Sequence, residues 1–110
     1  MPADGWWEQE CLGRQPMHNL QLRFDSRRIA GSGHDIIGSF TMIGTIAPDG
    51  KVTIIKRYLG MHAVRYVGSY DGEGLMWGQW WIGPLHNRWL IKIMPSSAHA
   101  ASVLEMEATT

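Results

Sequence analysis

Turn-forming residues recur about every ten positions along most of this chain, and this spacing restricts its fold more than any other feature. The turn signals run from Gly13 to Asn87. The segments between them are long enough for a strand but too short for a strand together with a helix. The spacing therefore predicts an antiparallel all-β protein.

A chain of 110 residues forms one domain with a single core, which we place at residues 1–94. Residues 95–110 are rich in Ala, Ser, Glu and Thr, a composition that favours a flexible tail or a short helix. The strands are expected near residues 5–11, 16–24, 28–33, 38–47, 51–58, 62–70, 75–82 and 88–94.

Turn length predicts which residues of neighbouring strands lie opposite each other. The Pro-Asp-Gly turn, taken as a three-residue loop, sets Phe40 opposite Tyr58 and Met42 opposite Lys56. The next turn, Leu-Gly-Met, sets Tyr58 opposite His62. Residues set opposite each other in this way share one face of the sheet.

The last two turns extend this register. The Asp-Gly-Glu-Gly segment, taken as a four-residue loop, sets Tyr66 opposite Gln79 and Val64 opposite Trp81, and the following loop sets Trp81 opposite Trp89. Eight antiparallel strands with one apolar face predict a closed up-and-down barrel, because closure removes exposed sheet edges. The apolar face contains Leu20, Leu22, Phe24, Ile29, Phe40, Met42, Ile46, Val52, Ile54, Tyr58, Val64, Tyr66, Leu75, Trp77, Trp81, Trp89, Ile91 and Ile93.

Several stretches of the chain resemble a known family. Over residues 5–94 the chain resembles small uncharacterised bacterial proteins that are similar in layout to the streptavidin-like calycin barrels. The resemblance implies the barrel and supplies no catalytic residues. The polar binding loop of biotin binders has no counterpart here. The stretches are GSGHDIIGSF at 31–40, KRYLG at 56–60, VRYVG at 64–68, DGEG at 71–74 and GQWWI at 78–82.

The predicted interior also carries polar residues. Lys56 is in phase with Tyr58, and a buried lysine needs a partner, for which Asp35 is the nearest carboxylate. A bulge in this strand would instead turn Lys56 outward. Gln79 opposite Tyr66 makes either a core hydrogen bond or a ligand contact. The candidate ligand-binding residues are Phe40, Lys56, Tyr58, His62, Tyr66, Trp77, Gln79, Trp81 and Trp89, with Asp35 as a possible polar partner.

Loops of an up-and-down barrel alternate between its two ends, which places His18, His34, His62 and His86 near one rim. We expect no metal site, because no HxH or HxxxH spacing occurs. The opposite rim has tight Asp and Gly turns, so any ligand should enter at the histidine-rich rim.

Other classes of site are disfavoured. The formal net charge is zero and basic residues form no block, which argues against nucleic acid, and no apolar run reaches membrane-spanning length. The start of the chain lacks the pattern of a signal peptide, which predicts a cytoplasmic protein. The lone Cys11 excludes an internal disulfide and is expected to be structural. No helix is expected after Gly31-Ser32-Gly33, so this segment is not a phosphate loop.

Two functions remain open, and no cofactor is expected for either. The first is binding of a small apolar or aromatic ligand inside a Trp-lined barrel. The second is an assembly module with a filled core, in which an outer apolar patch forms a homodimer or tetramer. A small acid–base enzyme using Lys56 and His62 ranks third. The outer patch consists of Ile43, Ile55, Val67, Trp80, Ile82 and Leu90.

Overall fold

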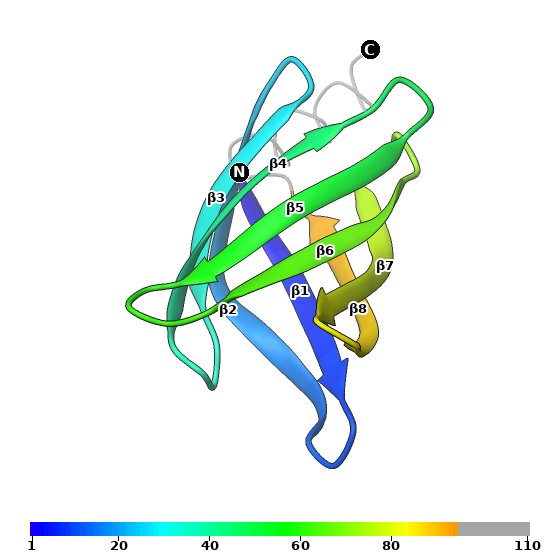
Figure 1. The fold of residues 1–110 in the computed structure, drawn as a ribbon. Coiled ribbons are helices and arrows are strands. Elements are labelled where there is room, and N and C mark those ends of the chain that lie inside the picture. The colour runs from blue at the N-terminus through cyan, green and yellow to red at the C-terminus, as the bar shows by residue number, and fades with distance from the viewer. Residues whose placement is uncertain (95–110) are drawn as a thin grey trace, which may run out of the picture.

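A computed structural model describes residues 1–94, which form the predicted closed barrel of eight antiparallel strands (Figure 1). Each strand pairs with the next along the chain, and β8 closes the barrel by pairing with β1. The predicted tail at 95–110 lies outside the described residues. The strands are β1 (Pro2–Gln9), β2 (Gly13–Asp25), β3 (Arg28–His34), β4 (Ser39–Ile46), β5 (Lys51–Tyr58), β6 (Ala63–Tyr70), β7 (Leu75–Ile82) and β8 (Leu85–Ile93).

The connections alternate between the two ends of the barrel, as expected for this topology. The β1–β2, β3–β4, β5–β6 and β7–β8 connections lie at the lower end in Figure 1, and the other three lie at the upper end. The lower end is the predicted histidine-rich rim. Within residues 1–94 no helix is long and apolar enough to cross a membrane.

The register of the central strands is as predicted. Phe40 pairs with Tyr58 and Met42 pairs with Lys56 across β4 and β5. The Tyr58 N–H donates to the carbonyl of His62 at 3.1 Å, which closes the β5–β6 turn in the predicted register. Alternate residues of these strands therefore point into the barrel, because side chains of a strand alternate between its faces.

Strand β7 has the opposite phase to the prediction. The turn before it is a three-residue loop and not a four-residue loop: the Asp71 N–H donates to the Leu75 carbonyl at 3.0 Å, and Asp71 Oδ1 accepts the Glu73 and Leu75 N–H groups. Tyr66 consequently pairs with Trp80. A shift of one residue moves every side chain of a strand to the other face.

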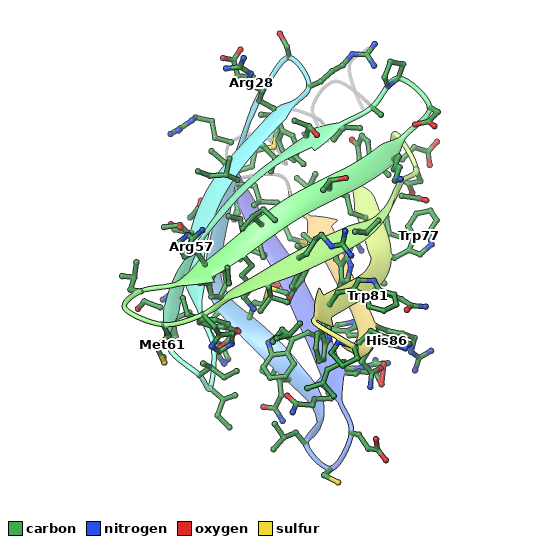
Figure 2. The ribbon with its side chains drawn as sticks, viewed as in Figure 1. Arg28, Arg57, Met61, Trp77, Trp81 and His86 are labelled. Atoms are coloured by element: carbon green, nitrogen blue, oxygen red, sulfur yellow. The ribbon has the colours of Figure 1, made fainter. Side chains whose placement is uncertain are left out.

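The shift exchanges the tryptophans of β7 between interior and exterior. Trp80 is only 5% exposed and points inward, whereas Trp77 is 42% exposed and points away from the barrel with Trp81 (Figure 2). Gln79 is exposed on the same outer face. The predicted interior positions of Trp77, Gln79 and Trp81 are therefore wrong. Leu75 is only partly buried.

The β7–β8 connection is also shorter than predicted. Ile82 pairs with Leu85 around a two-residue turn, so Trp81 lies opposite His86 and not opposite Trp89. Arg65 of β6, and not Val64 as predicted, lies opposite Trp81. On the β5 side, Val64 lies opposite Lys56. The two errors compensate in β8, where Trp89 is buried as predicted.

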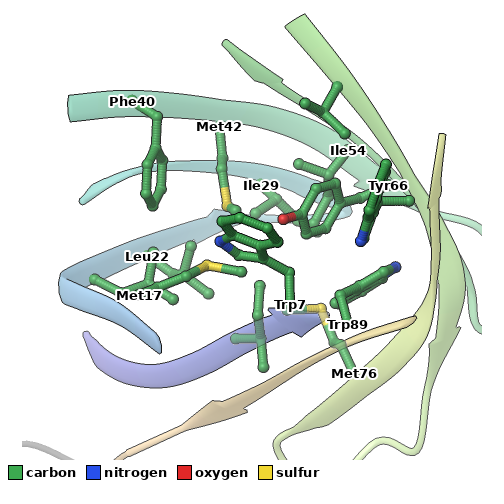
Figure 3. Close-up of a cluster of buried hydrophobic side chains, with 14 of the residues drawn as sticks. Trp7, Met17, Leu22, Ile29, Phe40, Met42, Ile54, Tyr66, Met76 and Trp89 are labelled. Carbon is green, nitrogen blue, oxygen red and sulfur yellow. The ribbon is translucent and has the colours of Figure 1, made fainter. Parts of the chain in front are cut away.

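Large buried side chains fill the barrel (Figure 3). They do so next to glycines, which have no side chain of their own. Gly68 and Gly78 pair directly across β6 and β7, and a Cβ atom on either would collide with the backbone of the neighbouring strand. The indole of Trp89, which pairs with Gly78, donates to the Val67 carbonyl at 3.2 Å and packs on Tyr66 with ring centres 5.1 Å apart. The glycines thus let the sheet bring these aromatic rings together.

Candidate functional site

A network of charged and aromatic side chains is buried beneath the histidine-rich rim. Its centre is an ion pair in which Lys56 Nζ lies 2.7 Å from Asp35 Oδ2, and both side chains are 0% exposed. The same carboxylate oxygen accepts hydrogen bonds from Tyr58 OH at 2.7 Å and from Trp7 Nε1 at 3.0 Å. Lys56 also donates to Tyr66 OH at 3.2 Å. One oxygen atom therefore receives donors from β1 and β5.

Asp35 reaches the interior because the β3–β4 connection folds back on itself. Its N–H donates to the Gly38 carbonyl at 3.0 Å, and its Oδ1 accepts the Ile37 N–H at 2.9 Å. An aspartate that bonds the backbone two residues ahead forms a local turn of its own. This turn holds the carboxylate inside the barrel.

Lys56 is carried inward by the alternation of β5. It occupies the same face as Ile54 and Tyr58, which confirms the predicted interior position and excludes the alternative of an outward bulge. Its ammonium lies 4.2 Å from the ring centre of Phe40, within the range of a cation–π interaction. Aromatic rings thus surround the Lys56 ammonium on the sides that Asp35 does not contact.

Burial and pairing shift the ionisation of these groups in different directions. Burial favours the neutral amine and lowers the pKa of Lys56 to about 8, against the opposing attraction of Asp35. Burial alone would raise the pKa of Asp35, but the hydrogen bond and charge of Lys56, together with the Tyr58 hydroxyl, bring it below its ordinary value. Burial raises the pKa of both Tyr58 and Tyr66. At neutral pH the network therefore contains one cation, one anion and two neutral phenols.

A narrow depression at the histidine-rich rim adjoins the network, because two residues that line it, Trp7 and Tyr58, also donate hydrogen bonds to Asp35. Trp7, Trp80 and Tyr58 supply aromatic walls, and the Trp7 and Trp80 rings meet edge to face with centres 6.5 Å apart. The free volume is about 20 Å³, room for about one water molecule. The remaining lining residues are Gln9, Ile37, His62, Val64 and Ile82.

The predicted site residues divide into three groups. Phe40, Lys56, Tyr58, Tyr66 and Asp35 meet in the buried network, and the predicted Lys56–Asp35 partnership is confirmed. His62 stands over Tyr58 at the rim, with ring centres 5.2 Å apart, and Trp89 lies deeper against Tyr66. Trp77, Gln79 and Trp81 lie outside the barrel and contribute nothing to this site.

Two tryptophans of the site were not predicted there. Trp7 is in phase with Ala3 and Gly5 on the inner face of β1, a short alternation that the sequence does contain. Trp80 and Ile82 had been assigned to the outer patch, but with the observed phase of β7 both line the depression, so that part of the prediction is wrong. The indole N–H of Trp80 donates to the Glu8 carbonyl at 2.8 Å, a contact between distant strands that no local pattern reveals.

The four histidines of the rim do not all meet at one point. His18 contacts His34, His62 contacts Tyr58, and His86 stacks on Trp81 with ring centres 4.3 Å apart. Among residues 1–94 no group of three or more histidine, cysteine or acidic side chains is placed to hold a metal ion.

No protein-family model, curated protein or solved structure matches this chain. The closed barrel agrees with the layout that the sequence resemblance implied. A fold of this kind does not specify an activity, so function has to be argued from the site.

Proposed function

We propose that the protein binds a small, neutral, largely apolar or aromatic molecule in the depression at the histidine-rich rim. The observation that carries this proposal is an aromatic-walled opening that shares Trp7 and Tyr58 with a buried charged network. Ligand sites are typically concave and mostly apolar, with a few convergent polar groups that fix orientation. Residues with perturbed ionisation gather at such sites more often than elsewhere.

The balance of charge in the network supports a neutral ligand. The ammonium of Lys56 is matched by the carboxylate of Asp35, and the tyrosines keep their protons. Among the described residues no buried side-chain nitrogen or oxygen lacks a hydrogen-bond partner. A charged ligand would lose its hydration without gaining a free counter-charge. The rings of Trp7, Tyr58 and Trp80 offer apolar contact instead.

Entry of a ligand requires the depression to widen. Most of its lining comes from strands, but Ile37 and His62 belong to the β3–β4 and β5–β6 connections. Connections move at lower cost than paired strands, because fewer backbone hydrogen bonds hold them. We therefore expect these two side chains to swing outward when a ligand enters.

A titration with 2-naphthol, a neutral aromatic probe, tests the proposal. Nuclear magnetic resonance should show the indole N–H signals of Trp7 and Trp80 shifting in a saturable manner. Ile37→Phe fills the depression and should abolish the shifts, whereas the matched control Ile36→Phe, at the exposed neighbouring position, should leave them intact. Shifts that survive Ile37→Phe, or that map to the Asp49 turn at the other end, would refute the site.

A second candidate, assembly into an oligomer, is favoured by one feature of the outer surface. Ile43 and Ile55 pair directly across β4 and β5 and are 69% and 39% exposed. Light scattering should detect a mass above that of the monomer, and Ile43→Lys should reduce it while the exposed control Thr45→Lys does not. A monomeric mass at high concentration would exclude this function.

A further inference from the structure

Two histidines form a cross-strand pair on the outer surface near the rim and take no part in the buried network. His18 of β2 and His34 of β3 are direct partners, and both are exposed. Their ring centres are 5.4 Å apart, with an angle of 31° between the planes. Directly opposed residues on antiparallel strands are among the closest side-chain pairs in a sheet.

The backbone at this position departs from regular β structure. The β2–β3 register shifts by one residue between His18 and Gln21, and Asn19 adopts a positive φ of 51°. A bulge of this kind redirects the neighbouring side chain and increases the local twist. His34 is the last residue of β3, immediately before Asp35 turns into the barrel. The backbone next to each imidazole is therefore irregular, with a bulge after His18 and a turn after His34.

We propose that His18 and His34 together bind one divalent transition-metal ion of the Zn²⁺, Ni²⁺ or Cu²⁺ type. Metal–nitrogen bonds of about 2 Å at a tetrahedral angle place two ligating imidazole centres about 5 Å apart. The observed separation of 5.4 Å between the ring centres is close to this value. Neutral imidazole is a ligand that suits these three metals.

The site is an open one. Since no third metal-ligating side chain joins the pair among residues 1–94, solvent or an added ligand completes the coordination. The other rim histidines contact aromatic rings instead, as His86 does on Trp81. A single imidazole has weaker affinity than a pair, so His86 offers a matched control.

Calorimetric titration of the untagged chain with ZnCl₂ and with NiCl₂ tests this proposal. The chain carries Cys11→Ser, because the exposed thiol of Cys11 binds the same ions. We expect one ion per chain, loss of saturable binding in both His18→Gln and His34→Gln, and unchanged binding in His86→Gln. Thermal unfolding without metal should be the same for all three variants, since all three side chains are exposed.

A second measurement locates the ion directly. Substoichiometric Cu²⁺ added to the Cys11→Ser chain should broaden the resonances of His18, Asn19 and His34 before those of His62 and His86. Saturable binding that persists in the His18→Gln and His34→Gln variants would overturn the proposal. So would broadening centred on any other histidine, or the absence of Zn²⁺ and Ni²⁺ binding by the starting chain.

Discussion

Replacing Lys56 by Met removes one charge from the buried network while keeping a side chain of similar length. The Asp35 carboxylate is left with three neutral donors, from Tyr58, Trp7 and the Ile37 backbone. Removing one member of a buried ion pair typically costs about 3–5 kcal/mol, because the other charge remains without compensation. The three remaining donors favour the lower end of this range, so we expect the free energy of unfolding to fall by about 3 kcal/mol.

A double-mutant cycle in chemical denaturation measures how much of this loss belongs to the pair. The cycle compares Lys56→Met, Asp35→Asn and the double variant at neutral pH. In the double variant no buried charge is left, and the amide oxygen that Asp35→Asn introduces still accepts hydrogen bonds from Tyr58 and Trp7. The double variant should therefore be more stable than Lys56→Met alone by about 1–2 kcal/mol.

The pH dependence supplies an independent check. Without Lys56, burial raises the pKa of Asp35 in the folded state above its unfolded value. The folded variant then binds a proton more readily than the unfolded chain, so acid stabilises it relative to the wild type. The loss of unfolding free energy in Lys56→Met, relative to the wild type, should be smaller at about pH 5 than at about pH 8. Strictly additive single variants, or a loss that does not vary with pH, would refute the assignment of the network's stability to this ion pair.

Three further predictions concern the barrel and its ionisation. Trp80→Ala should destabilise the fold by about 3–5 kcal/mol in urea denaturation, because it empties a buried aromatic site. Trp81→Ala, on the outer face, should cost about 1 kcal/mol or less. Equal losses in the two variants would contradict the observed phase of β7. Gly78→Ala should lower the melting temperature far more than Gly72→Ala, although Gly72 has a positive φ, since only at Gly78 does a Cβ collide with a neighbouring strand. Because burial lowers the pKa of Lys56 from 10.5 to about 8, the unfolded chain binds the extra proton between these values and the free energy of unfolding should rise with pH there. A rise of about 1–2 kcal/mol from pH 8 to about pH 9.5, absent in Lys56→Met, is the expected result.

The sequence by itself was enough to predict the number of strands, the closed barrel and the pairing of β4 with β5. These features depend on local chemistry, since turn residues limit loop length and alternation identifies the buried face. The Lys56–Asp35 pair was also among the predictions, because a lysine on an apolar face requires a carboxylate and Asp35 was the nearest one, although an outward Lys56 was left open. Each of these inferences rests on residues that differ clearly in polarity from their neighbours.

Only the tertiary structure decided which tryptophans face inward. Trp80 and Trp81, like Trp6 and Trp7, are adjacent and identical, so alternation of polarity cannot distinguish their faces. The choice depended on whether the turn before β7 contains three or four residues, which the hydrogen bonds of Asp71 decide. Whether the barrel is filled depended likewise on contacts between distant strands, where Trp89 packs beside the glycine of another strand. Such contacts arise from the closed sheet as a whole, and no local segment of the sequence contains them.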